Sequence, residues 1–146
     1  MVFFGEYRGR SDAQGRIVIP ARLRGALTGS KNASVYITRG IEKCLFLFPE
    51  TVWRSQSEKL KSLPFTKGDP RAFTRLFFSG ASQSNVDGQG RILVPTHLFQ
   101  YAGIKESVVI AGVGTHVEVW DEREWDAYFT RSLSAYGELA EKLIEQ

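Results

Sequence analysis

The sequence is poor in the residues that build disulfides, metal centres and most catalytic sites. Its 146 residues include one cysteine and two histidines. One cysteine cannot form an internal disulfide, so we expect Cys44 to be a small buried apolar residue, as suits a protein of a reducing compartment. Metal sites need clustered His, Cys or carboxylate ligands, and the sequence shows no such cluster. We therefore expect no metal and no other cofactor.

Long apolar runs are also missing. The longest, Cys44 to Phe48, is far shorter than the about 20 residues of a membrane-spanning helix. The chain opens without a basic region followed by an apolar stretch, so no signal peptide is expected. These absences predict a cytoplasmic protein with no membrane partner.

Charge is modest overall but unevenly distributed. The net charge is +3 and the pI about 9.1. Residues 1–31 carry six basic against two acidic side chains, whereas residues 121–146 carry three against seven. One end of the chain can therefore meet a polyanion while the other faces away from it. The moderate net charge argues against a nonspecific nucleic-acid binder, whose affinity comes from neutralising phosphates.

The strongest feature is an internal repeat. Residues 12–20 read D-A-Q-G-R-I-V-I-P and residues 87–95 read D-G-Q-G-R-I-L-V-P, with six of nine positions identical at an offset of 75. The order of matches continues through a later apolar stretch to Trp53 and Trp125, where the offset has fallen to 72. The chain therefore consists of two copies of one unit.

Each copy is predicted to fold as strand, turn, strand, short helix, hairpin and longer helix. The D-x-Q-G-R unit is a turn, because Asp bonds its own downstream backbone and Gly15 and Gly90 can adopt positive φ. Alternating apolar residues then predict a strand that Pro20 or Pro95 ends. The remaining elements are expected as helices 21–27, 96–102, 49–63 and 122–144, hairpins 34–38 with 44–48 and 107–111 with 116–120, and a strand over 77–84.

Neither copy is large enough to bury a good core alone, since a unit of about 60 residues buries only about 60% of its unfolded surface. We therefore expect the copies to intertwine into one pseudo-symmetric barrel. The repeat predicts a first unit over residues 1–63, a linker over 64–76, and a second unit with a C-terminal helix over 77–146.

The opening M-x-F-x-G-E-Y, the duplicated D-x-x-G-R-I-x-[IV]-P and the chain length resemble the MraZ family of bacterial regulators over nearly the whole chain. The resemblance implies an α+β, mainly β fold, with two tandem AbrB-like (SpoVT-AbrB) units in a pseudo-twofold swapped-hairpin β-barrel with flanking helices. It implies a sequence-specific, nucleoid-associated regulator of transcription, a repressor, that recognises short direct repeats in double-stranded DNA at the promoter of the division and cell-wall gene cluster. It also implies a ring-shaped homo-oligomer, expected to be an octamer.

Arginine on a stiff turn suits DNA recognition. Arg16 and Arg91 each follow a turn glycine, and a guanidinium can bond a guanine edge at two points or grip phosphate. A two-stranded ribbon also fits the major groove. Gln14 and Gln89 stand on the same turns and can bond adenine or phosphate.

The resemblance assigns DNA contact to these motif arginines. It adds Arg24, which matches a helix arginine that AbrB-like proteins also use. The second copy has Phe99 in that place, so the first half is expected to make the richer contact. The family often has Lys where Gln14 and Gln89 stand, which lowers the electrostatic attraction here. Arg10 is a further candidate, and for Arg8, Arg10 and Arg22 plain surface charge is an equal alternative.

An enzyme is the main rival class. Asp12 and Asp87 form a matched pair that acid–base chemistry can use, but both lie in turns with no nucleophile or base beside them. His97 and His116 occur in unmatched contexts and are expected to be structural or exposed. G-Q-G-R leads into a strand, whereas the dinucleotide-binding fingerprint requires a helix. The sequence therefore predicts no enzymatic activity.

A protein-interaction module, such as the antitoxin of a toxin pair, is the alternative function, because AbrB-like folds also serve there. Such antitoxins carry one copy and a disordered tail, whereas residues 122–146 are patterned as an amphipathic helix with an apolar stripe through Trp125, Phe129 and Leu133. The stripe predicts packing within a folded particle. The apolar opening Val2–Phe4 points to self-association as well.

Overall fold

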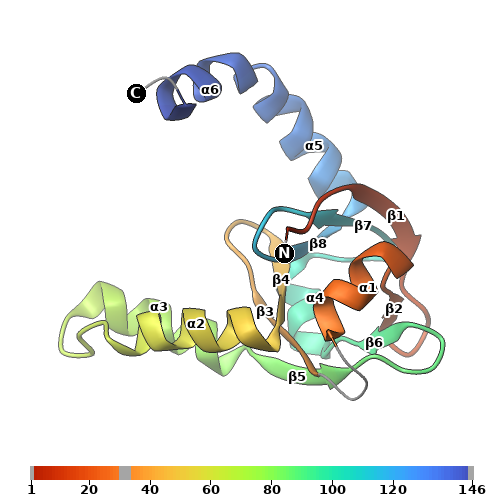
Figure 1. The fold of residues 1–146 in the computed structure, drawn as a ribbon, viewed down its shortest axis with the longest axis horizontal. Helices are drawn as coiled ribbons and strands as arrows, with labels where there is room; N and C mark the ends of the chain where they lie inside the picture. The colour runs from red at the N-terminus through yellow and green to blue at the C-terminus, as the bar shows by residue number, and fades with distance from the viewer. Residues whose placement is uncertain (1, 30–33, 145–146) are drawn as a thin grey trace.

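The computed structural model describes residues 2–29 and 34–144. Met1, which begins the family-like opening, and Lys31, which counts toward the basic N-terminal segment, lie outside the described residues, as do the last two residues of the predicted second unit. Figure 1 shows the arrangement of the elements along the chain. The strands are β1 (Glu6–Arg10), β2 (Arg16–Val18), β3 (Ser34–Arg39), β4 (Cys44–Pro49), β5 (Ser82–Asn85), β6 (Arg91–Leu93), β7 (Ser107–Gly112) and β8 (Val117–Asp121). The helices are α1 (Ala21–Thr28), α2 (Glu50–Lys61), α3 (Gly68–Ser79), α4 (Thr96–Ala102), α5 (Glu122–Leu133) and α6 (Tyr136–Ile144).

The two copies exchange their outer strands. In the six-stranded sheet, of order β1-β7-β8-β4-β3-β5, strand β1 of the first copy pairs with β7 of the second. Reciprocally, β5 of the second copy pairs with β3 of the first. The two predicted hairpins, β3–β4 and β7–β8, join through β4 and β8 at the centre. The expectation that the copies intertwine is therefore confirmed.

A second sheet joins the repeated motifs directly. Strand β2 pairs antiparallel with β6, so that Ile17 lies opposite Ile92. Two matching hydrogen bonds extend this ladder. The Ile19 amide donates to the Gly90 carbonyl at 2.8 Å, and the Val94 amide donates to the Gly15 carbonyl at 2.9 Å. The ribbon therefore has an approximate twofold axis at the Ile17–Ile92 pair.

The ribbon and the large sheet enclose one core. Ile17, Ile19 and Ile92 have no exposed surface, and they pack with Leu23 and Leu98 of the short helices against buried residues of the hairpins. Phe3 joins this core at 2% exposure, so only Val2 and Phe4 of the apolar opening lie on the surface.

The six-stranded sheet stays open at β1 and β5 and does not close into a continuous hydrogen-bonded barrel. The helices hold more residues than the strands, so the expectation of a mainly β protein is wrong.

Helix α3 overturns part of the prediction for the middle of the chain. It covers most of the expected linker and takes residues 77–79 from the expected strand, of which β5 retains the later part. Phe73 and Phe77 stack at 5.7 Å, one helical turn apart, and Phe77 stacks on Trp53 of α2 at 5.6 Å. Because this helical spacing stacks the aromatic side chains along one face and buries Phe77, it outweighs the strand-like local composition.

The predicted C-terminal helix is two helices. It breaks at Ser134, which caps the end of α5, and α6 begins at Tyr136. Figure 1 shows that α5 and α6 extend from one side of the body, whereas α2 and α3 form a separate arm. Both helical extensions leave the β2–β6 ribbon uncovered.

The contact at the twofold axis yields a stability prediction. Ile92→Ala removes fully buried side-chain volume and should lower the free energy of unfolding by about 2–5 kcal/mol. Leu93→Ala, on the outer face of the same strand, is the control and should change it by no more than about 0.5 kcal/mol. Urea denaturation at one protein concentration measures both. Equal effects would show that the ribbon does not close the core.

Candidate nucleic-acid interface

The two repeated turns have the same internal geometry. In the first, Asp12 Oδ1 accepts hydrogen bonds from the Gln14 and Arg16 amides, each at 2.9 Å, and Gly15 has a φ of 80°. In the second, Asp87 Oδ1 accepts from the Gln89 and Arg91 amides at the same distance. An aspartate and a left-handed glycine therefore shape each turn through hydrogen bonds between near neighbours in the sequence.

Each turn also holds its arginine. Arg16 Nε donates to Asp12 Oδ2 at 2.8 Å, and Arg91 Nε donates to Asp87 Oδ2 at 2.8 Å. For the terminal nitrogens of both guanidinium groups, the part of the chain that the structure describes provides no hydrogen-bond partner. The inner edge of each fork is anchored and the outer edge is available to a bidentate acceptor. This anchoring lowers the entropy that each arginine loses on binding.

The turn aspartates are structural groups. The hydrogen bond from the Arg16 amide has the largest effect on the pKa of Asp12 and lowers it. Desolvation, the next largest effect, opposes this, but the Arg16 guanidinium and the Gln14 amide lower the pKa further, so that it lies below its ordinary value. The pKa of Asp87 is lowered in the same way by the Arg91 amide and side chain and the Gln89 amide. Both carboxyls are therefore ionised at neutral pH. They cap turns, as the sequence predicted, and do not act as a proton-exchanging pair.

The ribbon presents a mixed outer face. Because side chains alternate along a strand, Ile17 and Ile92 point into the core while the flanking residues point outward. Val18 and Leu93 are 50% and 57% exposed, and each lies opposite a turn arginine in the ladder. The antiparallel register places the two turns at opposite ends of the ribbon. The outer face therefore carries two anchored guanidinium groups and two aliphatic side chains.

The glutamines and Arg24 lie around the turns. Gln14 and Gln89 give their amides to the turn aspartates and are exposed. Arg24 in α1 donates to the Ile19 carbonyl at 3.0 and 3.3 Å. Its guanidinium rests on Gly90, the glycine of the second turn, where a Cβ would overlap it. Arg24 belongs to the first copy in sequence, but in space it lies beside the turn of the second copy.

Arg8 and Arg10 make ion pairs. Arg10 pairs with Glu106 at the surface. Arg8 meets Asp126, Glu6 and Glu122 at 3.0, 3.0 and 3.4 Å, and hydrogen bonds to Asp126 and Glu6 raise its pKa. Arg8 thus ties β1 to α5.

Two further basic residues, Arg22 and Lys105, are exposed. Arg22 is exposed on α1. Sequence reasoning missed Lys105, which lines a hollow beside the first turn together with Asp12, Gln14 and Phe99. Lys105 lies just before β7, outside the repeated motif, so no sequence signal pointed to it.

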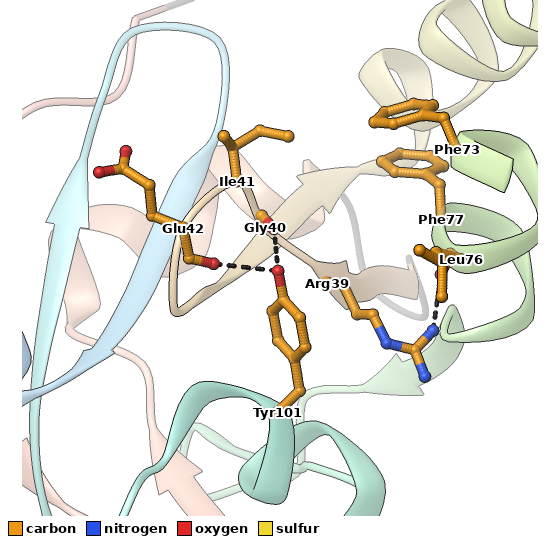
Figure 2. Close-up of a pocket in the computed structure, with 8 residues that line it drawn as sticks. All are labelled: Arg39, Gly40, Ile41, Glu42, Phe73, Leu76, Phe77 and Tyr101. Carbon is orange, nitrogen blue, oxygen red and sulfur yellow. Dashed lines mark hydrogen bonds between the residues drawn. The ribbon is translucent and has the colours of Figure 1, made fainter. Parts of the chain in front are cut away.

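A second hollow lies between α3, α4 and the β3–β4 turn (Figure 2). Tyr101 donates to the carbonyls of Gly40 and Glu42 at 2.7 and 3.0 Å, and Arg39 donates to the Leu76 carbonyl at 2.6 Å. Figure 2 shows that the Tyr101 hydroxyl and the Arg39 guanidinium are both engaged with backbone carbonyls of the residues that line the hollow. The hollow is a joint between the two copies.

The rarer reactive residues have structural positions. Cys44 is buried, which raises the pKa of its thiol, and it confirms the expectation of an apolar role. His97 bonds the Gly80 carbonyl, and His116 packs edge-on against Phe46 at 4.5 Å. Over residues 2–29 and 34–144, no three His, Cys, Asp or Glu side chains come together as a metal site. Within the same ranges, no helix has the length and apolar character to cross a membrane.

Comparison with known proteins identifies the family. A family model described as "MraZ protein, putative antitoxin-like" matches residues 2–76 and again residues 77–143. The chain belongs to the MraZ family. The two matches divide the chain between its two repeated copies, in line with the duplicated turn.

Relatives in the MraZ family align over nearly their whole length. "Transcriptional regulator MraZ" of Carboxydothermus hydrogenoformans is 48% identical over 144 residues, 99% of this chain and 98% of the relative. Proteins of the same name from Heliobacterium modesticaldum and Desulforamulus reducens are 46% and 43% identical, covering 99% of this chain and 98% and 99% of theirs. The family is thus one of named transcriptional regulators and not of enzymes.

The turn carboxyls give a pH prediction. Because folding lowers their pKa below the ordinary 3.8, they stabilise the fold above that pH, and the contribution is lost as pH falls through the folded-state value. Asp12→Asn/Asp87→Asn keeps the Oδ1 acceptors but lacks this linkage. Its free energy of unfolding should therefore fall less steeply than the wild type's between about pH 5 and pH 2. Glu141→Gln, an exposed change in α6, is the control. If the free energy of unfolding of the double variant falls with pH as steeply as that of the wild type, the turn aspartates do not stabilise the fold in this way.

Proposed function

We propose that the protein is a sequence-specific transcriptional regulator that binds double-stranded DNA through the β2–β6 ribbon. The observation that carries this proposal is the pair of aspartate-anchored arginines, Arg16 and Arg91, on one uncovered ribbon. Full-length relatives named transcriptional regulators support it. No enzymatic step is part of the proposal.

In this proposal the ribbon enters the major groove, which is wide enough for two antiparallel strands. The free edge of each turn arginine bonds guanine O6 and N7. Gln14 and Gln89, at the tips of the turns, bond adenine or phosphate, and Val18 and Leu93 contact thymine methyl groups. Arg24 supplies a further cation, and Arg10 contributes once DNA competes with Glu106 for it.

The biological target follows from the family resemblance. The DNA is expected to be short direct repeats in the promoter of the division and cell-wall gene cluster, with binding acting as repression in the cytoplasm, at the nucleoid. The AbrB-like swapped-hairpin barrel, with units over 1–63 and 77–146 and a connection over 64–76, is the proposed evolutionary description of the fold. Its support is the exchange of β1 and β5 between the copies.

A ring-shaped homo-oligomer, expected to be an octamer, is the proposed working form. Its support is an apolar face on α5 and α6 that the chain itself leaves open, with Phe129, Leu133 and Leu139 exposed by 45%, 57% and 45%. This face forms a groove with Trp125, Tyr128 and Tyr136. A ring would present several ribbons to successive repeats and raise affinity through effective concentration. The alternative, an antitoxin-like interaction module, would use the same face for a different protein.

The turn arginines are testable by DNA binding. Arg16→Ala and Arg91→Ala should each weaken binding to a promoter fragment carrying direct repeats by about 1–3 kcal/mol. Fluorescence anisotropy across a salt series measures this, with a scrambled fragment of equal length alongside. Arg54→Ala is the matched control, because it removes the same charge from an exposed site on α2.

Two results would contradict the DNA-reading role. Equal affinity for both fragments, governed by salt alone, would identify a nonspecific binder. If the protein binds neither fragment at low salt, the aspartate-anchored arginines have a structural role, and the function lies in binding another protein.

The apolar face is testable by mass. Purified protein should form a large homo-oligomer by light scattering, and Leu133→Lys/Leu139→Lys should reduce the mass because charge in an apolar contact is costly. Ala127→Lys adds charge to an exposed α5 site outside the groove lining and should leave the mass unchanged. A monomeric wild type would favour the interaction-module alternative.

A further inference from the structure

The two turns differ in the side chain that rests on their glycine. Gly90 of the second turn is covered by the Arg24 guanidinium, whereas Gly15 of the first is covered by the Phe99 ring, whose Cε2 lies 3.2 Å from where a Cβ would stand. Arg24 and Phe99 occupy equivalent places, 75 residues apart, in α1 and α4. One pseudosymmetric position is thus cationic and the other aromatic.

The exchange between copies causes this placement. Because the Ile19 amide bonds the Gly90 carbonyl and the Val94 amide bonds the Gly15 carbonyl, each short helix begins beside the turn of the other copy. The Ile19 carbonyl then holds Arg24 in place through Nε and one terminal nitrogen. The first copy's cation therefore belongs to the second copy's turn.

We propose that Arg24 acts on DNA together with Arg91, and that the unequal turns give each protomer a fixed direction on its DNA. This inference rests on the proposed DNA-binding function. A ribbon with two equal ends would bind equally well in either direction and would favour palindromic sites, as symmetric dimers do. A ribbon whose two turns differ in DNA affinity binds best to a site whose two half-sites differ in sequence. When such a site is repeated, protomers on successive direct repeats all bind in the same orientation.

The additional cations beside the two turns are chemically different. The first turn has Lys105 in its neighbouring hollow, and Arg10 nearby is paired with Glu106. An ammonium is a point charge, whereas the guanidinium at the second turn can bond phosphate with two parallel donors. Helix α1 also carries the exposed Arg22, whose counterpart His97 is bonded to the Gly80 carbonyl.

A double-mutant cycle tests which turn Arg24 serves. Arg24→Gln removes the charge and keeps a donor for the Ile19 carbonyl. Alone, it and each turn-arginine substitution should raise Kd for the direct-repeat fragment about tenfold. Combined with Arg91→Ala it should raise Kd by clearly less than the product of the single effects, because the two act at one contact. Combined with Arg16→Ala it should reach the product. Coupling to Arg16, or full additivity with both, would overturn the inference.

Directed cleavage tests orientation. Iron–EDTA attached at Ala13→Cys or at Gly88→Cys, two equivalent and exposed turn positions, with the native Cys44 buried away from the reagent, should cut the DNA at one end of each repeat only. The two attachment positions should cut at opposite ends. In the exchanged variant Arg24→Phe/Phe99→Arg, checked for folding by circular dichroism, cleavage should move to the opposite end of each repeat or become equal at both ends. Equal cutting at both ends by the unexchanged protein would overturn the directional inference while leaving specific binding intact. Failure to prefer the repeats over the scrambled fragment would instead overturn the proposed function.

Discussion

The antiparallel pairing of β2 with β6 is the contact on which the rest of the structure depends. Three residues from each copy form this ladder, and its central pair, Ile17 and Ile92, is fully buried. The pairing closes the core that neither copy could close alone, because apart from the residues in and beside its outer strands each copy contributes one hairpin and one short helix to it. It also brings two turns that are far apart in the sequence onto one ribbon. Stability and the candidate binding face therefore share one interaction.

The repeated turn combines two roles in few atoms. One oxygen of each aspartate shapes the backbone and the other anchors the arginine side chain. Because all these bonds span four residues or fewer, the turn keeps its form wherever the strands around it lead. An anchored arginine with a free outer edge suits bidentate recognition, since little side-chain freedom remains to be lost.

The sequence predicted the local elements well and the long-range ones less well. Both hairpins and both short helices lie where alternation, Pro20 and Pro95 indicated. The strand expected from residue 77 begins later because aromatic residues of α3 stack on Trp53, a contact 24 residues away that local composition cannot reveal. The break at Ser134 was not predicted because the apolar period of the sequence continues across it. The described part of the acidic C-terminal segment, residues 121–144, runs from the end of β8 through α5 and α6, and these two helices lie apart from the β2–β6 ribbon (Figure 1).

The duplication, the shape of each turn and the arginine on it all follow from the amino-acid sequence, because they depend on hydrogen bonds between near neighbours and on the positive φ open to glycine. Which strands pair and which turn each short helix meets depend on the folding of the whole chain, because burying one shared core requires the two copies to exchange strands. Arg24 illustrates the difference. Its place in the chain associates it with Arg16, but the exchange places it on Gly90, beside the turn of Arg91.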